Sequence, residues 1–193
     1  MHTHEDYRPI TLLNTDYKIL GRTVASCLRG ILAEILHPSQ HGGVQGGGIF
    51  DAGATVRDAI AYAEKTQTPL CFLSLDFTEA FDRISHTYLF KLLSVYGFST
   101  KFTAFIKNMY DQAHSTLHIN GHTTSPFPIQ CGVRQGCPLS MLLFALCLTP
   151  LLRLLDRTLT GIRIARGTRT AAVAYADDIT LFVTDPNDSP ELA

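Results

Sequence analysis

Residues 172–183, AVAYADDITLFV, constrain the fold of this chain more than any other stretch of its sequence. Apolar and β-branched residues on both sides predict two strands of a buried hairpin whose tip is Ala176–Asp177. Asp177 and Asp178 interrupt this apolar run, although ionised carboxylates are rarely buried without a partner. The fold must therefore provide water or a cation at the tip of the hairpin.

A third aspartate ends another strongly apolar run. LCFLSLD, residues 70–76, predicts a nearly continuous buried strand that ends at Asp76. If the two runs are neighbours in one sheet, Asp76, Asp177 and Asp178 meet at the same edge. Three like charges at one place repel unless some are protonated or a cation lies among them. The alternative is that Asp177 and Asp178 form only a solvated turn, where aspartate is a favoured residue.

Such a group of carboxylates is typical of sites that hold hard divalent cations. Mg²⁺ takes oxygen ligands and typically uses one or two carboxylates together with substrate phosphates. Two such ions about 4 Å apart activate an attacking hydroxyl and stabilise the leaving oxygen in phosphoryl transfer. The combination of the hairpin with Asp76 therefore favours a phosphoryl-transfer site over a simple turn.

The rest of the chain alternates predicted helices with short antiparallel strands. Asn120–Gly121 is the strongest short hairpin signal, and Pro138 opens a long apolar helix. The other predicted elements are a short strand at 8–14, a helix from Asn14 or Thr15 to about Leu36, a helix at 51–66, a helix capped by Ser85 and closed by Gly97, a helix from Ser99 to about Asp111, and a short strand before residue 172. The regular period of βαβ units is absent, so the predicted class is α+β.

Composition and charge limit the kinds of protein that this chain can be. The 193 residues are 46% hydrophobic, enough for one domain or two small lobes with a core. A net charge of −1 does not by itself indicate a nucleic-acid-binding protein. Five cysteines without a CxxC pair predict reduced thiols in an intracellular protein, nuclear, cytoplasmic or both. The apolar stretch within 138–155 is shorter than the roughly 20 residues of a membrane span, and no signal-peptide core begins the chain.

Three blocks in order, FLSLDFTEAFDRIS, GVRQGCPLS and AYADDITLF, resemble motifs A, B and C of reverse transcriptases. The resemblance is greatest to non-LTR (LINE-type) retrotransposons. YRPITLLNTDYKIL and HPSQHGGVQGGGIFDAGATVRDAI resemble the two finger motifs that precede these blocks in that family. The similarity runs from about residue 7 to residue 185. The YADD step alone is a weak match, whereas the order of the blocks is a specific one.

The resemblance implies the fingers and palm of a right-hand polymerase, with an antiparallel palm sheet packed on helices. Residues 1–69 would form a fingers-like region, and residues 70–185 a palm-like region with a hairpin insertion near 114–131. Residues 186–193 would be a tail, with the thumb of the family absent. We therefore expect little processive synthesis from these residues alone, and primer extension from a longer protein that includes the thumb.

The resemblance also implies the catalytic groups. Asp76 and Asp177 match the two metal-bridging aspartates of the family, and Asp178 matches the accessory one. The backbone carbonyl of Phe77 would complete the site of the nucleotide-bound ion. The implied cofactor is a pair of Mg²⁺ ions, for which Mn²⁺ is a possible substitute. The implied reaction is attack of a primer 3′-hydroxyl on the α-phosphate of a dNTP.

Nucleotide-binding residues follow from the same resemblance. Arg8 matches the finger arginine that holds the triphosphate, and its guanidinium suits bidentate phosphate contact. Phe81 lies at the position of the sugar gate that excludes a 2′-hydroxyl, with a core position as the alternative. Gln135 and Gly136 match the pair that lies against the nascent base pair. Arg134 could contact the template or the nucleotide. Arg163, Arg166 and Arg169 form a small basic cluster, which makes Arg163 and Arg166 candidate nucleic-acid contacts, with an ordinary solvated face as the alternative.

The function implied is an RNA-directed DNA polymerase within a retrotransposon polyprotein. Its partners would be an RNA template, a DNA primer and dNTPs, beside thumb and endonuclease regions of the parent protein. Val44 and Gly47 stand where the second finger motif carries an aromatic residue and an arginine, which predicts a weaker template grip. The alternatives are an inactive or domesticated, maturase-like relative that at most binds nucleic acid, and an RNA-templated RNA polymerase, against which Phe81 and the YADD form argue.

Two other groups of residues invite a metal-site interpretation. Asp82 follows Asp76 by six residues, and we expect it to pair structurally with Arg83 or a neighbour rather than bind metal. His114, His118 and His122 are spaced by four, which on a helix would suggest zinc. Because Asn120–Gly121 predicts a hairpin there, we expect these histidines to face solvent.

Overall fold

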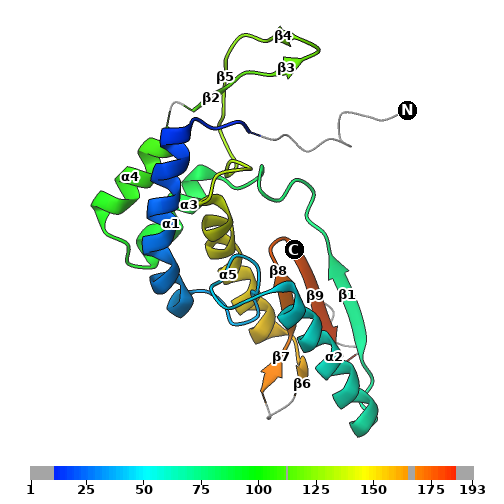
Figure 1. Cartoon of the computed structure of the whole chain (residues 1–193). Coiled ribbons are helices and arrows are strands. Elements are labelled where there is room, and N and C mark those ends of the chain that lie inside the picture. Colours follow the sequence, from blue (N-terminus) through cyan, green and yellow to red (C-terminus); the bar gives the residue numbers. More distant parts are fainter. Residues whose placement is uncertain (1–10, 112, 165–167, 186–193) are drawn as a thin grey trace. The chain divides into compact units, whose positions relative to one another are not determined.

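A computed structural model of the chain describes residues 11–111, 113–164 and 168–185 (Figure 1). The chain divides into two units, one formed by Met1–Leu12 with Glu79–Gly136 and the other by Leu13–Thr78 with Cys137–Ala193. Helices and small antiparallel sheets make up the described residues, which confirms the α+β class. The division into fingers-like and palm-like regions at residue 69 stays a prediction.

The unit that contains the acidic hairpin is built on a three-stranded antiparallel sheet in the order β1–β9–β8. A separate two-stranded pair, β6–β7, precedes the hairpin in the chain. The elements of this unit are α1 (Thr15–Ile35), α2 (Ile49–Thr66), β1 (Cys71–Leu75), α5 (Ser140–Thr158), β6 (Ile162–Arg163), β7 (Arg169–Thr170), β8 (Ala172–Tyr175) and β9 (Asp178–Val183). The helices predicted near 14–36 and 51–66 and the hairpin tip at Ala176–Asp177 are confirmed.

The core of this unit gathers around α5 and the central strand β9. Nearly every residue of α5 from Leu142 to Thr149 is buried, as expected for a helix that is apolar on all sides. Helix α5 packs against α1 and β8, and α2 packs against β8 and β6. Phe182 of β9 is fully buried among the α2 alanines and Val173. Strands β8 and β9 of the hairpin are therefore the part of the sheet that lies in the core.

The other unit consists of two packed helices and two short hairpin-like pairs. Its elements are α3 (His86–Val95), α4 (Thr100–Tyr110), β2 (His114–Ser115), β3 (His118–Ile119), β4 (His122–Thr123) and β5 (Phe127–Pro128), with β2 paired to β5 and β3 to β4. Ser85 and Ser99 cap α3 and α4 by accepting hydrogen bonds from the backbone N–H of Tyr88 (3.4 Å) and Phe102 (3.2 Å). These hydrogen bonds confirm both predicted caps. Serine is favoured at this position because its hydroxyl satisfies an N–H that has no partner within the helix.

The Asn120–Gly121 turn is also confirmed. Its two residues have φ angles of 49° and 81°, and Ile119 pairs with His122 across them. Positive φ at both central residues is the pattern of a type I′ turn, which Asn-Gly adopts at low cost and which matches the twist of paired strands.

Strand β1 is correctly located, but the prediction that it is buried is wrong. Phe72 and Leu73 are 39% and 40% exposed, and the rest of the strand is exposed or half-buried. An apolar run predicts burial on both sides, whereas among the described residues this strand lies at the edge of its sheet, with β9 as its one neighbour. The central position, and with it the burial, belongs to β9.

One further prediction about local structure differs from the fold. Residues 11–14 have no regular structure, and residues 8–10 of the predicted strand lie outside the described residues. The long apolar helix is present as predicted, and α5 continues through Pro150. An internal proline costs about 3 kcal/mol, and the side chains that α5 buries on both sides of Pro150 offset that loss.

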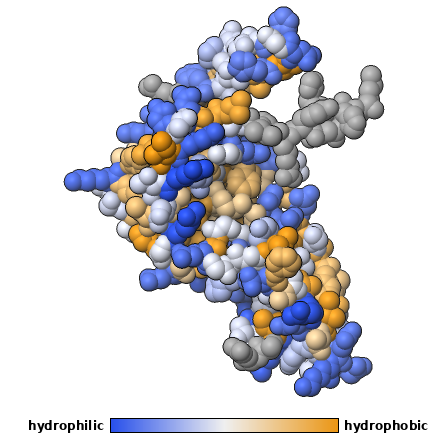
Figure 2. All heavy atoms as spheres, viewed as in Figure 1, coloured by the Kyte–Doolittle hydropathy of each residue, from blue (hydrophilic) through white to orange (hydrophobic). Residues whose placement is uncertain are grey.

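Apolar side chains remain scattered over the surface. Figure 2 shows hydrophobic and hydrophilic side chains interspersed on the visible face. Leu12, Phe50 and Val95 are among the most exposed large apolar residues. Scattered exposure of this kind is ordinary for folded proteins. Among the helices of the described segments, none is both long enough and apolar enough to cross a bilayer.

We expect Phe182→Ala to destabilise the protein by about 3–5 kcal/mol, because it empties a fully buried aromatic site between β9 and α2. Phe50→Ala is the matched control, since Phe50 is 89% exposed and its removal should change stability by about 0.5 kcal/mol or less. Urea unfolding of the two variants measures both values. Equal midpoints would contradict the described core.

Candidate active site

The three predicted aspartates lie at one end of the central sheet. Strand β1 pairs with β9 so that Leu75 lies opposite Ile179. Asp76 follows Leu75 immediately, and Asp178 immediately precedes Ile179. Neighbouring strands are about 4.8 Å apart, so Asp76 and Asp178 are neighbours across the sheet. The strand neighbourhood on which the three-carboxylate hypothesis depends is therefore present.

The hairpin between β8 and β9 presents the other aspartate. Tyr175 pairs with Asp178, which leaves Ala176 and Asp177 as a two-residue loop. Asp76 and Asp178 are exposed, and Asp177 is half-buried. The three aspartates therefore lie where the strands emerge from the core. The apolar run suggested that their carboxylates are buried, but in the fold they remain at least partly in contact with water.

The chemistry of these groups fits a hard divalent cation. All three are oxygen donors, the ligand type that Mg²⁺ prefers. In the described segments, none of the three carboxylates forms an ion pair or a side-chain hydrogen bond with another residue. The same segments contain no ready-made group of three His, Cys, Asp or Glu side chains arranged to hold a metal by themselves. In general, Mg²⁺ completes its coordination with substrate phosphates and water oxygens beside one or two carboxylates.

The glycine-rich loop after α1 contacts the hairpin. The backbone N–H of His41 donates to Ala174 O at 2.8 Å, and Ala174 N–H donates to Ser39 O at the same distance. A Cβ added to Gly42 would lie 2.2 Å from the backbone nitrogen of Ala176. The start of this loop therefore follows β8 closely, a contact that the sequence pattern did not reveal.

In the other unit, the residues that resemble motifs A and B are brought together. Val133 N–H donates to Phe81 O at 2.8 Å, and the Gln135 side chain donates to Asp82 Oδ2 at 2.8 Å. Asp82 is therefore a structural partner as expected, but its partner is Gln135. The expected alternative partner, Arg83, instead pairs with Glu79 at 3.5 Å.

The neighbours of Gln135 have different environments. Gly136 has a φ of +90°, and an added Cβ would lie 3.1 Å from Thr11 O. Glycine suits this backbone conformation, because it carries no side chain to clash. The guanidinium of Arg134 lies over the Tyr110 ring, 5.8 Å from its centroid.

The remaining candidate residues are basic. Arg163 is exposed on β6, opposite Arg169. Arg169 instead serves the local fold, because its guanidinium donates to the backbone oxygens of Leu159, Thr160 and Asp156. Arg8 and Arg166 lie outside the described residues.

The three spaced histidines are exposed, as predicted. His118 and His122 lie on the β3–β4 hairpin, and His118 Nδ1 is 3.0 Å from Thr123 Oγ1. His114 lies on β2 opposite Pro128. The hairpin replaces the helix that a zinc site with spacing of four would require.

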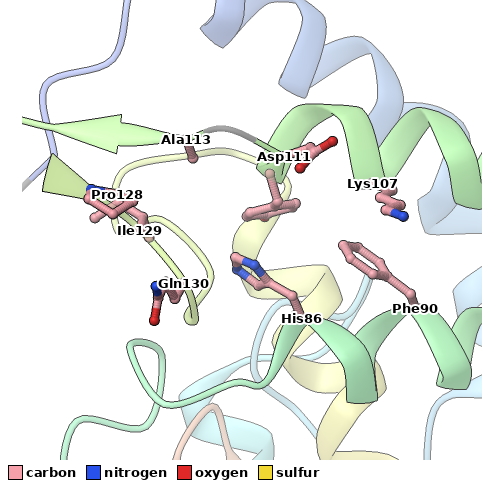
Figure 3. A pocket seen from close by; sticks show the side chains of 9 residues that line it. His86, Phe90, Lys107, Asp111, Ala113, Pro128, Ile129 and Gln130 are labelled. Atoms are coloured by element: carbon pink, nitrogen blue, oxygen red, sulfur yellow. The ribbon is translucent and has the colours of Figure 1, made fainter.

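A pocket of about 350 Å³ lies in the same unit as these histidines, which does not contain the three aspartates. Figure 3 shows Phe90 of α3 opposite Lys107 of α4, with His86 of α3, Gln130 and Asp111, which follows α4, also lining the pocket. His86 Nε2 is 2.9 Å from Gly132 O, so the imidazole contributes to the local fold. No motif of the sequence predicted this pocket.

Most of this chain is similar in sequence to transposon proteins. The family model "Reverse transcriptase (RNA-dependent DNA polymerase)" matches residues 2–192. The chain is 42% identical over 182 residues to the "Transposon TX1 uncharacterized 149 kDa protein" of Xenopus laevis. It is 31% identical over 179 residues to the "Retrovirus-related Pol polyprotein from type-2 retrotransposable element R2DM" of Drosophila melanogaster. These alignments cover 94% and 92% of the chain but only 14% and 16% of the two relatives.

Solved structures with a similar fold include two of telomerase from Candida tropicalis. The complex with a fragment of telomeric RNA aligns with a TM-score of 0.61 at 14% identity, covering 88% of this chain and 29% of that one. The truncated apo form aligns with a TM-score of 0.53 at 15% identity, covering 89% and 35%. At such identities the likeness concerns the fold.

We expect Gly42→Ala to destabilise the protein by about 1–3 kcal/mol, because the new methyl group would overlap backbone atoms of Ala176. Gly53→Ala is the matched control: nothing lies within 4 Å of an added Cβ on that helical glycine. The control should stabilise by about 0.5–1 kcal/mol through helix propensity. Thermal unfolding distinguishes the two, and a stabilising Gly42→Ala would contradict the close contact of loop and hairpin.

Proposed function

The chain belongs to the reverse transcriptase (RNA-dependent DNA polymerase) family, among relatives from non-LTR retrotransposons, and from that premise we propose that it catalyses RNA-templated DNA synthesis. The observation that carries the proposal is the β1–β9 register, which makes Asp76 a neighbour of Asp178 and of the hairpin loop that holds Asp177. A solvated turn would require only the hairpin. The pairing with a third aspartate from a segment about a hundred residues earlier in the chain supports a catalytic site.

In the proposed site, Asp76 and Asp177 would be the principal metal ligands, with Asp178 as an accessory carboxylate and the Phe77 carbonyl as a further oxygen donor. Their position at the open end of the sheet leaves room for substrate oxygens. A bound pair of Mg²⁺ ions, or Mn²⁺ in their place, would supply activation of the primer hydroxyl and stabilisation of the leaving oxygen. The positions of the three carboxylates would determine where the metal ions bind.

The other proposed roles belong to substrate binding. Phe81 would contact the sugar of the dNTP, and Gln135 and Gly136 would lie against the nascent base pair. The Gln135–Asp82 hydrogen bond supports this, because it restrains the glutamine side chain before substrate arrives. Arg8 would hold the triphosphate, and the nucleic acid would be contacted by Arg134, Arg163 and Arg166.

The assignment of fingers to residues 1–69 and palm to 70–185 belongs to the same proposal. The likeness to the telomerase structures supports a polymerase-type fold for most of the chain. The β2–β5 and β3–β4 pairs fall within the hairpin insertion expected near 114–131.

We expect Asp177→Asn to reduce extension of a DNA primer on an RNA template by roughly a thousandfold or more, because it removes several kcal/mol of metal-mediated transition-state stabilisation. The assay uses dNTPs and Mg²⁺, with this chain and with a longer protein that contains it. Asp51→Asn, an exposed aspartate on α2, is the matched control and should leave the rate unchanged. Undiminished extension by Asp177→Asn would overturn the metal assignment, and template binding without any extension by the unchanged protein would favour an inactive relative.

We expect Phe81→Ala to raise the use of ribonucleotides relative to deoxynucleotides by about tenfold or more, because the smaller side chain removes the clash with a 2′-hydroxyl. The ratio of kcat/KM for an rNTP and its dNTP measures the change. A ratio that stays constant while the protein remains folded would assign Phe81 to the core instead.

A further inference from the structure

Gln40, in the loop that follows α1, is one of few polar side chains that the described fold buries, with 2% of its surface exposed. Its amide forms three hydrogen bonds with the backbone of two neighbours. Gln40 Oε1 accepts from the backbone N–H of Gly42 (2.7 Å) and of Ala176 (3.0 Å), and Nε2 donates to Ala176 O (3.1 Å). A single rigid amide therefore holds both backbone groups of Ala176.

Ala176 needs such support because of its conformation. It has a φ of +56°, which costs a residue with a side chain about 1–2 kcal/mol. It is the first residue of the two-residue loop between Tyr175 and Asp178, and Asp177 does not share its positive φ. A positive φ at the first position alone matches a type II′ turn, where glycine is usual. The alanine holds this turn with the help of Gln40.

Fixing Ala176 also fixes the residue that follows it. The Ala176 carbonyl belongs to the peptide plane that leads directly into Asp177. With that oxygen bonded to Gln40 Nε2, the plane cannot rotate without losing a buried hydrogen bond. Gln40, in the loop between α1 and α2, therefore restrains the position of the Asp177 backbone relative to β9.

The loop is itself anchored. His37 Nε2 lies 3.0 Å from Asp156 Oδ2 on α5, and Ser39 N–H donates to His37 Nδ1 at 3.3 Å. Burial lowers the pKa of His37, an effect that Asp156 partly offsets. A neutral imidazole that donates from Nε2 and accepts at Nδ1 satisfies both contacts. On the other side of Gln40, His41 bonds to Ala174 of β8.

We propose that Gln40 is a positioning residue for the carboxylates of the hairpin: its amide holds Ala176 in the left-handed conformation that presents Asp177 and Asp178 beside Asp76. The inference rests on the proposed function and adds a residue from the glycine-rich loop to it. Gln40 acts through the turn and contacts no substrate. A neutral side chain with one donor and one acceptor is required, because the two groups of Ala176 have opposite polarity.

This requirement makes Gln40→Glu the most informative variant. A protonated glutamic acid has the shape of glutamine, accepts at its carbonyl oxygen and donates from its hydroxyl. An ionised one loses the donor and adds a negative charge near the aspartates. Burial favours the protonated form of a carboxyl group. The variant should therefore resemble the unchanged protein at low pH and lose function as the pH rises.

The experiment measures primer extension and, separately, binding of Mn²⁺ alone by electron paramagnetic resonance, between about pH 6 and pH 9. We expect the extension rate of Gln40→Glu, divided by that of the unchanged protein, to fall about tenfold across this range. Gln40→Ala should be reduced about tenfold at every pH and bind Mn²⁺ about tenfold more weakly. Gln67→Glu, at the exposed end of α2, is the charge-matched control and should give a flat ratio.

The outcomes separate this inference from the proposed function. An unchanged protein that neither extends primers nor binds Mn²⁺ refutes both. If it does both, a flat Gln40→Glu ratio with Mn²⁺ affinity intact in Gln40→Ala overturns the positioning role alone. Should Gln40→Ala not fold, the pH profile of Gln40→Glu decides the question, since that side chain keeps the volume of glutamine.

Discussion

The antiparallel pairing of β1 with β9 is the interaction on which the rest of this structure depends. It brings Asp76 to the acidic hairpin, although the two are about a hundred residues apart in the chain. A slip of one residue would turn every side chain of β1 to the opposite face. Strand β9 anchors this pair in the core, because Phe182 is buried on one face of that strand while Ile179 and Leu181 are buried on the other.

The fold separates charge from burial at this site. The exposed or half-buried carboxylates lie where the strands leave the core, so water attenuates their mutual repulsion. The polar group that supports them from inside is a neutral amide, which can be buried with its hydrogen bonds satisfied. A buried charge in the place of Gln40 would be far more costly to desolvate and would add to the repulsion. The apolar hairpin can therefore carry an acidic site, because the buried Gln40 amide is neutral and the charged carboxylates are at least partly exposed.

Much of the local structure was predictable because local chemistry decides it. Ser85 and Ser99 begin helices since their hydroxyls satisfy free backbone N–H groups, and Asn120–Gly121 turns since both residues tolerate positive φ. The burial of β1 was not predictable, because an apolar run does not reveal whether its strand has one neighbour or two. Continuation of α5 through Pro150 likewise depended on packing partners elsewhere in the chain.

The order of residues along the chain was enough to predict the two-residue loop at Ala176–Asp177, the strand that ends at Asp76 and the family to which the ordered motifs point. Those features depend on neighbours within a few residues or on the order of short blocks. Three other features are visible only in the folded chain: β1 is an edge strand, Gln135 bonds to Asp82, and Gln40 holds Ala176 from 136 positions away. Contacts of that kind arise from how the chain folds back on itself, and the periodicity of a single segment carries no record of them.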